Sequence, residues 1–295
     1  MPRPALSATR AVAVLDLLAA HPREAFTLTD VAARLGVNVA STHAVLAALA
    51  DAGYLVRHPR TRAFTLGPAV AALGTAALET HPAVDLARDA ARRLAHATGL
   101  EVAVTTVAGD DIVWVATAGE PTARGVPMHV GQHVPFKPPI GSVFAAWGRG
   151  DQWAARAKDP EAMQAVLHAV RARGYSVALE ADARKELGHA LDELARQPSD
   201  QRRRSDVDKL VSALEQRDYQ VRELVPSEAY DVSMIAAPVF GADGSVLLAI
   251  TLVGFPSAIP ASVVAEHGER LRDVALVVTR RSRGRVPSLG AAPAG

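Results

Sequence analysis

One continuous stretch, from Thr27 to Leu66, constrains the fold more than any other part of the chain. Two short segments with apolar residues at helical spacing are separated only by Gly36-Val37-Asn38, so two helices must turn sharply against each other. Two short β-rich runs follow, at 54–56 and 63–66, and they flank a turn that contains proline. The order helix, tight turn, helix, hairpin predicts a winged helix-turn-helix.

Three helices with one common apolar side are expected in this region. Ser7 is the expected cap of the first helix, which His21-Pro22 should end. Thr29 is the expected cap of the second helix, which Gly36 should end, and Asn38 is that of the third. In the third helix the residues spaced to face inward are Thr42, Val45, Leu46 and Leu49.

The outward side of the third helix would then carry small and polar side chains. Small residues would let the helix lie deep in a DNA major groove, with Ser41 and His43 as the polar groups that read bases. The same pattern also fits an amphipathic helix whose polar side meets only water. The candidate DNA contacts here are Thr29, Asn38, Ala40, Ser41, Thr42 and His43.

A basic turn favours the DNA interpretation. Arg57, Arg60 and Arg62 lie within six residues, and guanidinium groups at a hairpin tip are suitable partners for the phosphates beside a groove. The whole chain has Lys+Arg 32 against Asp+Glu 31, so no global field attracts nucleic acid. Residues 1–75 carry seven Arg against four Asp or Glu, a net charge of 7 − 4 = +3, so the excess is local. A solvated charged turn is the alternative.

A larger second domain should follow a connecting helix over 69–78, which begins after Gly67-Pro68. Val126–Val130 is expected as a strand, although its proline weakens the pattern. Other expected elements are helices over 82–97, 143–155, 160–173 and 260–281, strands over 100–108 and 112–118, and a hairpin over 230–254 with a turn at Gly241–Gly244.

A charged insertion is expected over 181–225, within the second domain. We predict two solvent-facing helices, Ala181–Gln197 and Asp206–Arg217, joined by an exposed loop over Pro198–Ser205. The arginines of that loop could touch DNA, but a solvated loop is the simpler interpretation. The end of the chain, Ser282–Gly295, is rich in Gly, Pro, Ala and Arg and is predicted to be disordered.

Composition excludes several kinds of chemistry. The chain has 295 residues, 49% of them hydrophobic, which is enough for two domains with a sizeable core. The absence of cysteine excludes disulfides, thiolate zinc sites and a cysteine nucleophile. His129 and His133 are four residues apart, but no nearby carboxylate completes a metal site, so no metal or cofactor is expected. No catalytic constellation of Ser, His and Asp or of paired carboxylates can be placed, so no enzyme is expected.

No apolar run reaches the roughly 18 residues that a membrane span needs, and the N-terminus lacks the apolar core of a signal peptide. These two observations predict a cytoplasmic protein without membrane contact.

Motifs near both ends of the chain resemble those of the IclR family of bacterial transcriptional regulators. SATRAVAVLDLLA comes first, and GVNVASTHAVL stands where the family's recognition helix often reads G-L-x-K-S-T-x-x-R-L-L. Farther on, YDVSMIAAPV and GADG match the family's G-V-x-C-x-A-A-P-V-x-D-x-x-G. The resemblance implies an α+β chain: a winged helix-turn-helix in 1–67, a linker helix in 68–81, a GAF-like effector-binding domain with an antiparallel sheet in 82–281, and the tail 282–295.

The resemblance also implies function and partners. Family members form homodimers or homotetramers that bind double-stranded operator DNA and respond to a small-molecule effector. Val39 and Ala44 stand where basic residues are frequent in the family, so this helix should make fewer phosphate and base contacts than usual. The alternatives are a constitutive DNA-binding protein with a ligand-free structural second domain, and an enzyme built on a GAF-like domain.

The effector pocket implied by the resemblance has lost polar groups. Met234 replaces a usual Cys, Thr251 a usual Ser, and Ala178 stands near a frequent Asp. Those polar groups hold a carboxylate in relatives that bind small acids, so we predict a more apolar pocket and a partly apolar effector. The candidate contacts are a wall of Trp114, Met128, Phe136 and Met234, with Gly141, Ser142 and Thr251 as polar contacts. These residues could equally fill a core.

Overall fold

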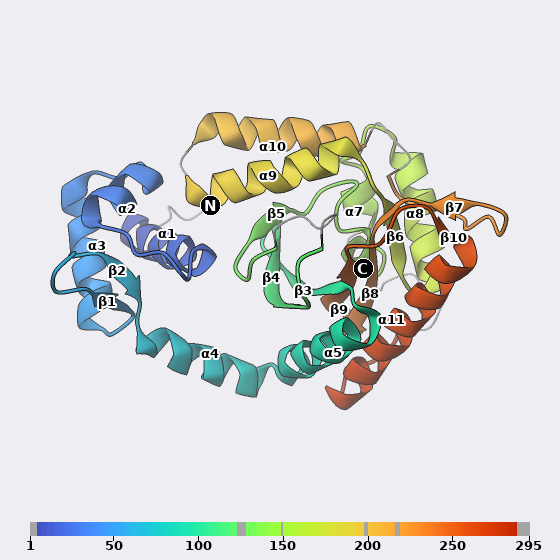
Figure 1. Ribbon diagram of the computed structural model, residues 1–295, viewed down its shortest axis with the longest axis horizontal. Helices are drawn as coiled ribbons and strands as arrows, with labels where there is room; N and C mark the ends of the chain where they lie inside the picture. Colours follow the sequence, from blue (N-terminus) through green and yellow to red (C-terminus); the bar gives the residue numbers. More distant parts are fainter. Residues whose placement is uncertain (1–4, 123–127, 149, 198–199, 216–218, 288–295) are drawn as a thin grey trace. The chain divides into compact units, whose positions relative to one another are not determined.

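The computed structural model describes residues 5–122, 128–148, 150–197, 200–215 and 219–287 (Figure 1). The chain divides into two compact units, which are described separately. The first comprises Met1–His81 with Ala190–Ser205, and the second comprises Pro82–His189 with Asp206–Gly295.

In the first unit, helices α1, α2 and α3 and a two-stranded hairpin surround a small apolar core. The first helix begins at Leu6, with Ala5 at the N-cap and no side-chain cap, so the prediction that Ser7 caps it is wrong. His21 ends that helix, as predicted. The elements are α1 Leu6–Ala20, α2 Leu28–Leu35, α3 Val39–Asp51, β1 Leu55–Arg57 and β2 Phe64–Leu66. The core consists of Val14, Leu17, Leu18, Phe26, Val31, Leu46, Leu55 and Phe64.

The connecting helix α4 (Pro68–Thr80) contains no buried residue, although it is rich in Ala, Val and Leu. Leu73 on this helix is 55% exposed. Gly67, just before α4, lies where a Cβ would stand 2.3 Å from the carbonyl oxygen of Gly53. The chain therefore needs glycine at this position to pass from the hairpin into the helix.

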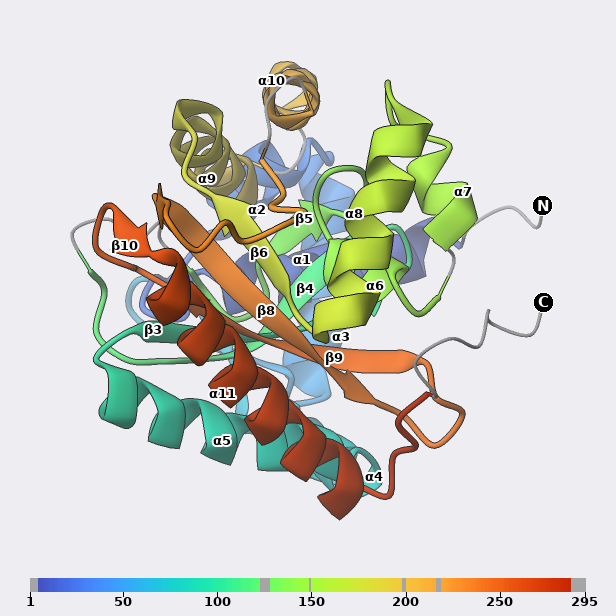
Figure 2. The ribbon, with the colours of Figure 1, turned by 90° about the vertical axis from the view of Figure 1, so that its right-hand side faces the viewer.

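The second unit is built on a six-stranded antiparallel sheet in the order β5-β4-β3-β9-β8-β6. Helices α5 (Pro82–Thr98) and α11 (Ala261–Arg281) pack against one face of it (Figure 2). A smaller pair of strands, β7 Ala229–Tyr230 and β10 Ile259–Pro260, lies apart from the main sheet. The main strands are β3 Glu101–Ala108, β4 Asp111–Ala118, β5 His133–Pro135, β6 Ser176–Leu179, β8 Val232–Phe240 and β9 Val246–Val253.

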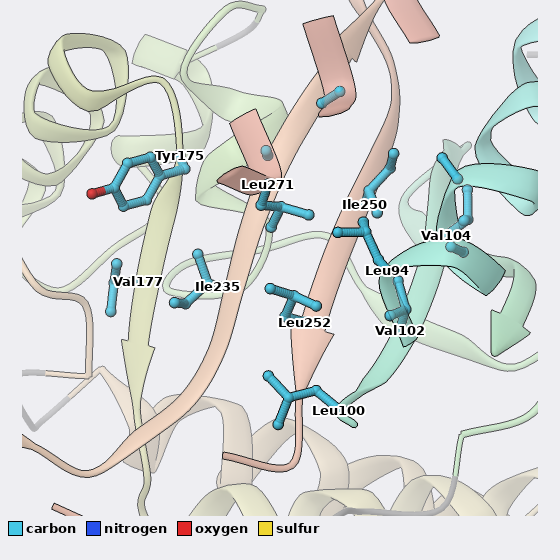
Figure 3. Packing of buried hydrophobic residues seen from close by; sticks show 14 of the residues in the cluster. Leu94, Leu100, Val102, Val104, Tyr175, Val177, Ile235, Ile250, Leu252 and Leu271 are labelled. Carbon is cyan, nitrogen blue, oxygen red and sulfur yellow. The ribbon is translucent and has the colours of Figure 1, made fainter. Parts of the chain in front are cut away.

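The main core of this unit lies between that face and the two helices (Figure 3). Alternate residues of the central strands, such as Val102, Ile250 and Leu252, point toward Leu94 of α5 and Leu271 of α11. All five side chains are at most 3% exposed. Because successive strand residues point to opposite faces, the intervening residues of these strands face the other side of the sheet.

Three shorter helices belong to the same unit: α6 Ser142–Ala145, α7 Gly150–Ala154 and α8 Pro160–Arg173. We predicted a single helix over 143–155, and the structure divides it into α6 and α7. Gly148 and Gly150 lie at the break, and a Cβ on Gly150 would stand 2.9 Å from the carbonyl oxygen of Ala145. Glycine weakens a helix and here permits this close approach, so the chain turns instead of continuing.

The predicted strand Val126–Val130 is wrong for the part that the structure describes. Residues 128–130 belong to no strand, and 126–127 lie outside the described residues. The strand that pairs with β4 is β5, through His133 with Val113 and Pro135 with Asp111.

The insertion forms two helices that lie side by side, α9 Asp182–Arg196 and α10 Gln201–Leu214 (Figures 1 and 2). The predicted exposed loop therefore ends earlier than expected, because residues 201–205 are helical. Asp200 starts α10 by accepting a hydrogen bond from the Arg202 amide at 2.9 Å. Each helix also has a buried side, so neither faces only solvent; the buried leucines and valines are Leu187, Leu191, Val207, Val211 and Leu214.

The predicted disordered tail begins with a fixed segment. The amide of Arg285 donates to the carbonyl oxygen of Gly241 at 2.9 Å, and that of Gly284 to Thr279 at 2.7 Å. Gly284 is thus fixed to the end of α11 and Arg285 to the β8–β9 turn, whereas 288–295 lie outside the described residues.

Candidate DNA interface and ligand site

The turn between α2 and α3 is fixed by side-chain caps. The cap of α2 is Thr27 and not the predicted Thr29: the Asp30 amide bonds to the Thr27 hydroxyl, and the Thr27 amide donates to the Asp30 carboxylate at 2.9 Å. The Thr27 hydroxyl also donates to the Asp30 carboxylate, at 2.6 Å, and this bond, with the one from the Thr27 amide, lowers the pKa of Asp30 below its ordinary value. Thr29 is the exposed second residue of the helix, and its hydroxyl lies 2.9 Å from that of Thr27. The spacing T-x-x-D could have identified the true cap.

The third helix begins as predicted. The Asn38 side chain accepts a hydrogen bond from the Ser41 amide at 2.8 Å, and Gly36, in the left-handed conformation at φ 62°, ends α2 just before it. Thr42 is 2% exposed and its hydroxyl donates to the Asn38 carbonyl oxygen, so this predicted DNA contact faces the core. Ala40 and His43 are exposed and Ser41 is half-exposed.

The hairpin after α3 has a fixed tip. Leu55 pairs with Leu66 and Arg57 with Phe64, and the Arg62 amide closes the tip by donating to the His58 carbonyl oxygen at 2.9 Å. The guanidinium of Arg57 lies over the Phe64 ring at 5.5 Å. The arginines at 57, 60 and 62 are all exposed. Arg62 has a φ of 55°, a conformation that favours glycine.

Some of the predicted ligand residues lie on the face of the main sheet opposite α5 and α11, here called the second face. Strand pairing sets its side chains in rows, because residues paired across strands point the same way. One row holds Glu101, Val253, Met234, Ala178 and Gln220. The next holds Ala103, Thr251, Ala236 and Ser176, and a third holds Trp114, Thr105, Ala249 and Pro238.

Three of the seven predicted residues, Trp114, Met234 and Thr251, thus share the second face. Thr251 is 8% exposed, and Trp114 and Met234 are half-buried. Met128 follows the undescribed segment 123–127 and belongs to no strand.

Phe136 and Gly141 are used in packing. The Phe136 ring lies 6.3 Å from that of Phe144, among the apolar side chains of α6, α7 and α8. Gly141 has a φ of 88°, and a Cβ there would stand 2.6 Å from the Phe136 ring and 2.8 Å from Ile112. The need for glycine at this position is therefore explained by close packing.

Ser142 is joined to a residue that sequence reasoning missed. Its hydroxyl, on a side chain 2% exposed, donates to Oε1 of Gln220 at 3.2 Å. Nε2 of Gln220 donates to the Pro139 carbonyl oxygen at 3.1 Å. Gln220 lies after α10 in the insertion and bridges to Ala178, so it extends the sheet by one more row position. A lone glutamine 42 positions after Ala178 carries no periodic signal that could have indicated this placement.

The charged groups at this site are mostly paired. Nζ of Lys137 lies 2.5 Å from Oδ1 of Asp208 on α10. Glu101, 6% exposed, accepts hydrogen bonds at Oε1 from the amide and the hydroxyl of Thr122, at 2.8 and 3.2 Å. Burial raises the pKa of Tyr219, the neighbour of Gln220, so its phenol stays neutral.

Comparison with known proteins concerns the first unit most directly. A family model described as the IclR helix-turn-helix domain matches residues 7–59, the segment that contains most of α1 and all of α2, α3 and β1. This segment of the chain is therefore similar to the helix-turn-helix domain of IclR proteins.

One relative and two solved structures are similar to this chain over longer stretches. It is 28% identical over 190 residues to the HTH-type transcriptional regulator BhcR of Paracoccus denitrificans, covering 57% of this chain and 64% of that relative, slightly under two thirds of its length. The fold is that of an IclR transcriptional regulator of Alicyclobacillus acidocaldarius (TM-score 0.66, 21% identity, 95% of this chain and 100% of that one). It is also that of an IclR homologue of Microbacterium hydrocarbonoxydans in complex with 4-hydroxybenzoate (TM-score 0.62, 16% identity, 94% and 99%).

Two other features of the second unit resemble binding sites. A groove of about 680 Å³ lies between α5 and α11, with Leu86, Leu94 and Val278 among its lining residues. It is on the side of the sheet away from the second face. Nδ1 of His133 lies 3.3 Å from Asp111, and within the described residues no group of three His, Asp or Glu side chains is arranged to hold a metal ion.

The helices are short or polar compared with membrane spans. No single helix of the described segments is long and apolar enough to cross a bilayer. Only together do α2 and α3 reach the length and apolar composition of a membrane span, and this pair is bent by 116°.

Proposed function

We propose that the chain is a sequence-specific, DNA-binding transcriptional regulator that acts in the cytoplasm, and that its second unit binds a small molecule which changes operator affinity. The match of residues 7–59 to the IclR helix-turn-helix domain and the similarity to the regulator BhcR support the DNA-binding part. We propose no enzymatic activity, since the relatives found are regulators.

The observation that supports this proposal most is that α3 has an exposed outward side and that the hairpin after it has a basic tip. Ala40, Ser41 and His43 leave the outward side of α3 small and polar, so the helix can enter a major groove. The arginines at 57, 60 and 62 would then reach the flanking phosphates. Thr42 and Asn38 would act indirectly, by fixing the start of the helix.

Arg62 gives independent support for phosphate binding. A non-glycine residue at a φ of 55° costs on the order of 1 kcal/mol relative to glycine. A turn selected only for stability would favour glycine or asparagine here. Arginine at this strained position is explained if its charge has a use that outweighs the conformational cost.

We further propose that the chain acts as a homodimer or homotetramer. A two-fold dimer would read a roughly palindromic operator with half-sites about one helical turn, or a multiple of it, apart. The unburied apolar residues of α4 support a partner for that helix. A ligand would alter DNA binding only if it bound two geometries of the assembly with unequal affinity.

The second face is the proposed ligand site, with Trp114, Met234, Thr251 and Ser142 as its contacts. A relative of the same fold holds 4-hydroxybenzoate, which makes an aromatic ligand a reasonable probe. The alternative is a DNA-binding protein with a ligand-free structural second unit, in which these side chains only fill space.

Operator selection tests the proposal. A random duplex library should yield a palindromic consensus that the purified full-length protein retains in gel shifts. Thermal-shift screening of small aromatic and aliphatic molecules should then find compounds that raise the melting temperature and change operator affinity together. Failure to enrich any sequence at low salt would overturn the DNA-binding part, and operator binding that no stabilising compound alters would favour the constitutive alternative.

A further inference from the structure

We propose that the second face takes an uncharged ligand and that Gln220 selects it; this inference rests on the ligand-binding part of the proposed function. The ligand class is a neutral molecule with an apolar body and a carbonyl or similar acceptor, such as a carboxamide, and not a free carboxylate. Three observations support this class: the position of Gln220, the hydrogen bonds it has left to make, and the charges around it.

Gln220 reaches the site because the chain returns from the insertion beside β6. The Leu179 amide donates to the Tyr219 carbonyl oxygen at 2.8 Å, and the Val221 amide to that of Val177 at 2.9 Å. These two bonds flank the bridge between Ala178 and Gln220. The Gln220 side chain therefore points to the same face as Ala178 and Met234. Ala178 stands near a position where the IclR family frequently has an Asp, so the sequence predicted the loss of a polar group there. The insertion supplies a polar group, Gln220, next to Ala178.

The hydrogen bonds of Gln220 leave a donor for a ligand. Oε1 accepts from the Ser142 hydroxyl, and one Nε2 hydrogen goes to the Pro139 carbonyl oxygen. A primary amide has two N–H groups, so one donor is left over. The Ser142 proton is already used, so its oxygen can only accept. The end of the site near α6 therefore offers one N–H to a carbonyl oxygen and one weaker acceptor to an N–H.

The local charges disfavour an anion. The only charged side chain in the three rows of the second face, all made of described residues, is Glu101, and it lies in the same row as Gln220. Lys137 is the nearby cation along the chain, and Asp208 already neutralises it at 2.5 Å. A carboxylate bound among these groups would lose its hydration without gaining a counterion, and it would face a like charge.

A second donor lies on the same face, in the row that contains Trp114. Nε1 of Trp114 is buried and has no hydrogen-bond partner among the residues that the structure describes. Buried N–H groups without partners are uncommon in folded proteins, and a bound acceptor would satisfy this one. The two neutral donors, on Gln220 and Trp114, are separated by apolar side chains that include Met234 and Ala249. This arrangement fits an uncharged ligand with a hydrogen-bond acceptor at each end.

Matched pairs of compounds that differ in charge but hardly in shape test this inference. Full-length protein is titrated with 4-hydroxybenzamide and 4-hydroxybenzoate, phenylacetamide and phenylacetate, and octanamide and octanoate, using calorimetry and thermal shift. At least one carboxamide should bind with a Kd at least tenfold lower than its carboxylate partner. Gln220→Leu should weaken carboxamide binding about tenfold, whereas Gln201→Leu, an exposed glutamine of the same insertion, should leave it unchanged.

Two charge variants keep the test informative if Gln220→Leu folds poorly. Gln220→Lys adds a cation and Glu101→Gln removes an anion, so each should improve carboxylate binding relative to carboxamide. The inference is overturned if carboxylates bind the wild type as tightly as carboxamides, if the Gln220 variants do not change the preference, or if no compound binds. Operator retention in gel shifts is measured on the same preparations. If carboxylates bind and change operator retention, the proposed function stands and only this inference fails. If the protein does not bind an operator at all, the DNA-binding part is refuted whatever the ligand data show.

Discussion

Removing two charges from the hairpin tip should change how DNA binding depends on salt. Arg60→Gln and Arg62→Asn are the suitable substitutions, because asparagine tolerates the left-handed backbone of Arg62 better than alanine does. Arg57 is left in place since its guanidinium packs over Phe64, and its loss would also disturb the hairpin. The double variant therefore removes charge with little loss of packing.

The magnitude follows from counterion release. Each phosphate contact contributes about 0.9 to the slope of log Kd against log salt concentration, so two lost contacts in each of two hairpins lower the slope by about 3.6. Between 50 and 200 mM salt, wild-type affinity should then fall about 150-fold more than that of the variant. Fluorescence anisotropy on a selected operator at four salt concentrations measures both slopes.

A matched control separates this effect from net charge. Arg270→Gln with Arg280→Gln removes the same charge from exposed positions on α11, and it should leave the slope within experimental error of the wild type. If the Arg60 and Arg62 variant keeps the wild-type slope, these residues do not contact phosphate. An equal loss of slope in both variants would also refute the assignment, because net charge alone would then explain it.

Three further outcomes concern stability. Asn38→Ala removes the cap of α3 and should lower the free energy of unfolding by about 1 kcal/mol in denaturant titrations; an unchanged midpoint would contradict the capping role. Gly141→Ala should cost about 1–3 kcal/mol by calorimetry, because its Cβ would stand 2.6 Å from Phe136 at a φ of 88°, and a neutral result would mean that the ring moves aside freely. The pKa of Asp30 lies below its ordinary value of 3.8, chiefly through the hydrogen bond from the Thr27 side chain. The stabilisation that ionised Asp30 gives the folded state is therefore present above pH 3.8 and is lost as the pH falls through the lowered pKa. The stability difference between wild type and Asp30→Asn should therefore shrink below about pH 4, and a difference that is constant from pH 7 to pH 3 would exclude this linkage.

Local sequence patterns were sufficient to predict those parts of the fold in which one short segment determines its own structure. Asn38 caps α3 because its side chain needs only the amide three residues later, and Gly174 ends α8 because it can adopt a φ of 83°. The β8–β9 hairpin was predictable from two apolar runs around a Gly-rich turn. In each of these cases the necessary partner lies within a few residues.

The sequence was not sufficient where a residue's partner lies far away in the chain, or where two neighbouring residues could fill the same role. Thr27 and Thr29 are both capable caps, and the carboxylate of Asp30 decides between them. The packing of Phe136 against Phe144 and the cluster of α6, α7 and α8 could not be read from the sequence, because these partners come together only in the assembled unit. Gln220 joins the site through a bridge to Ala178, 42 positions earlier in the chain, and no periodicity reports such a pairing.

The way the insertion is attached has a consequence for engineering. Its entry at Leu179 and its exit at Tyr219 are hydrogen-bonded to each other, so the chain leaves the sheet and returns to it at almost the same point. Replacing residues 182–217 by a tight turn would leave no gap to bridge, and the shortened protein should still fold around β6. A foreign helical hairpin could be grafted at the same place, which makes this edge of the sheet a modular attachment point for sensors or reporters.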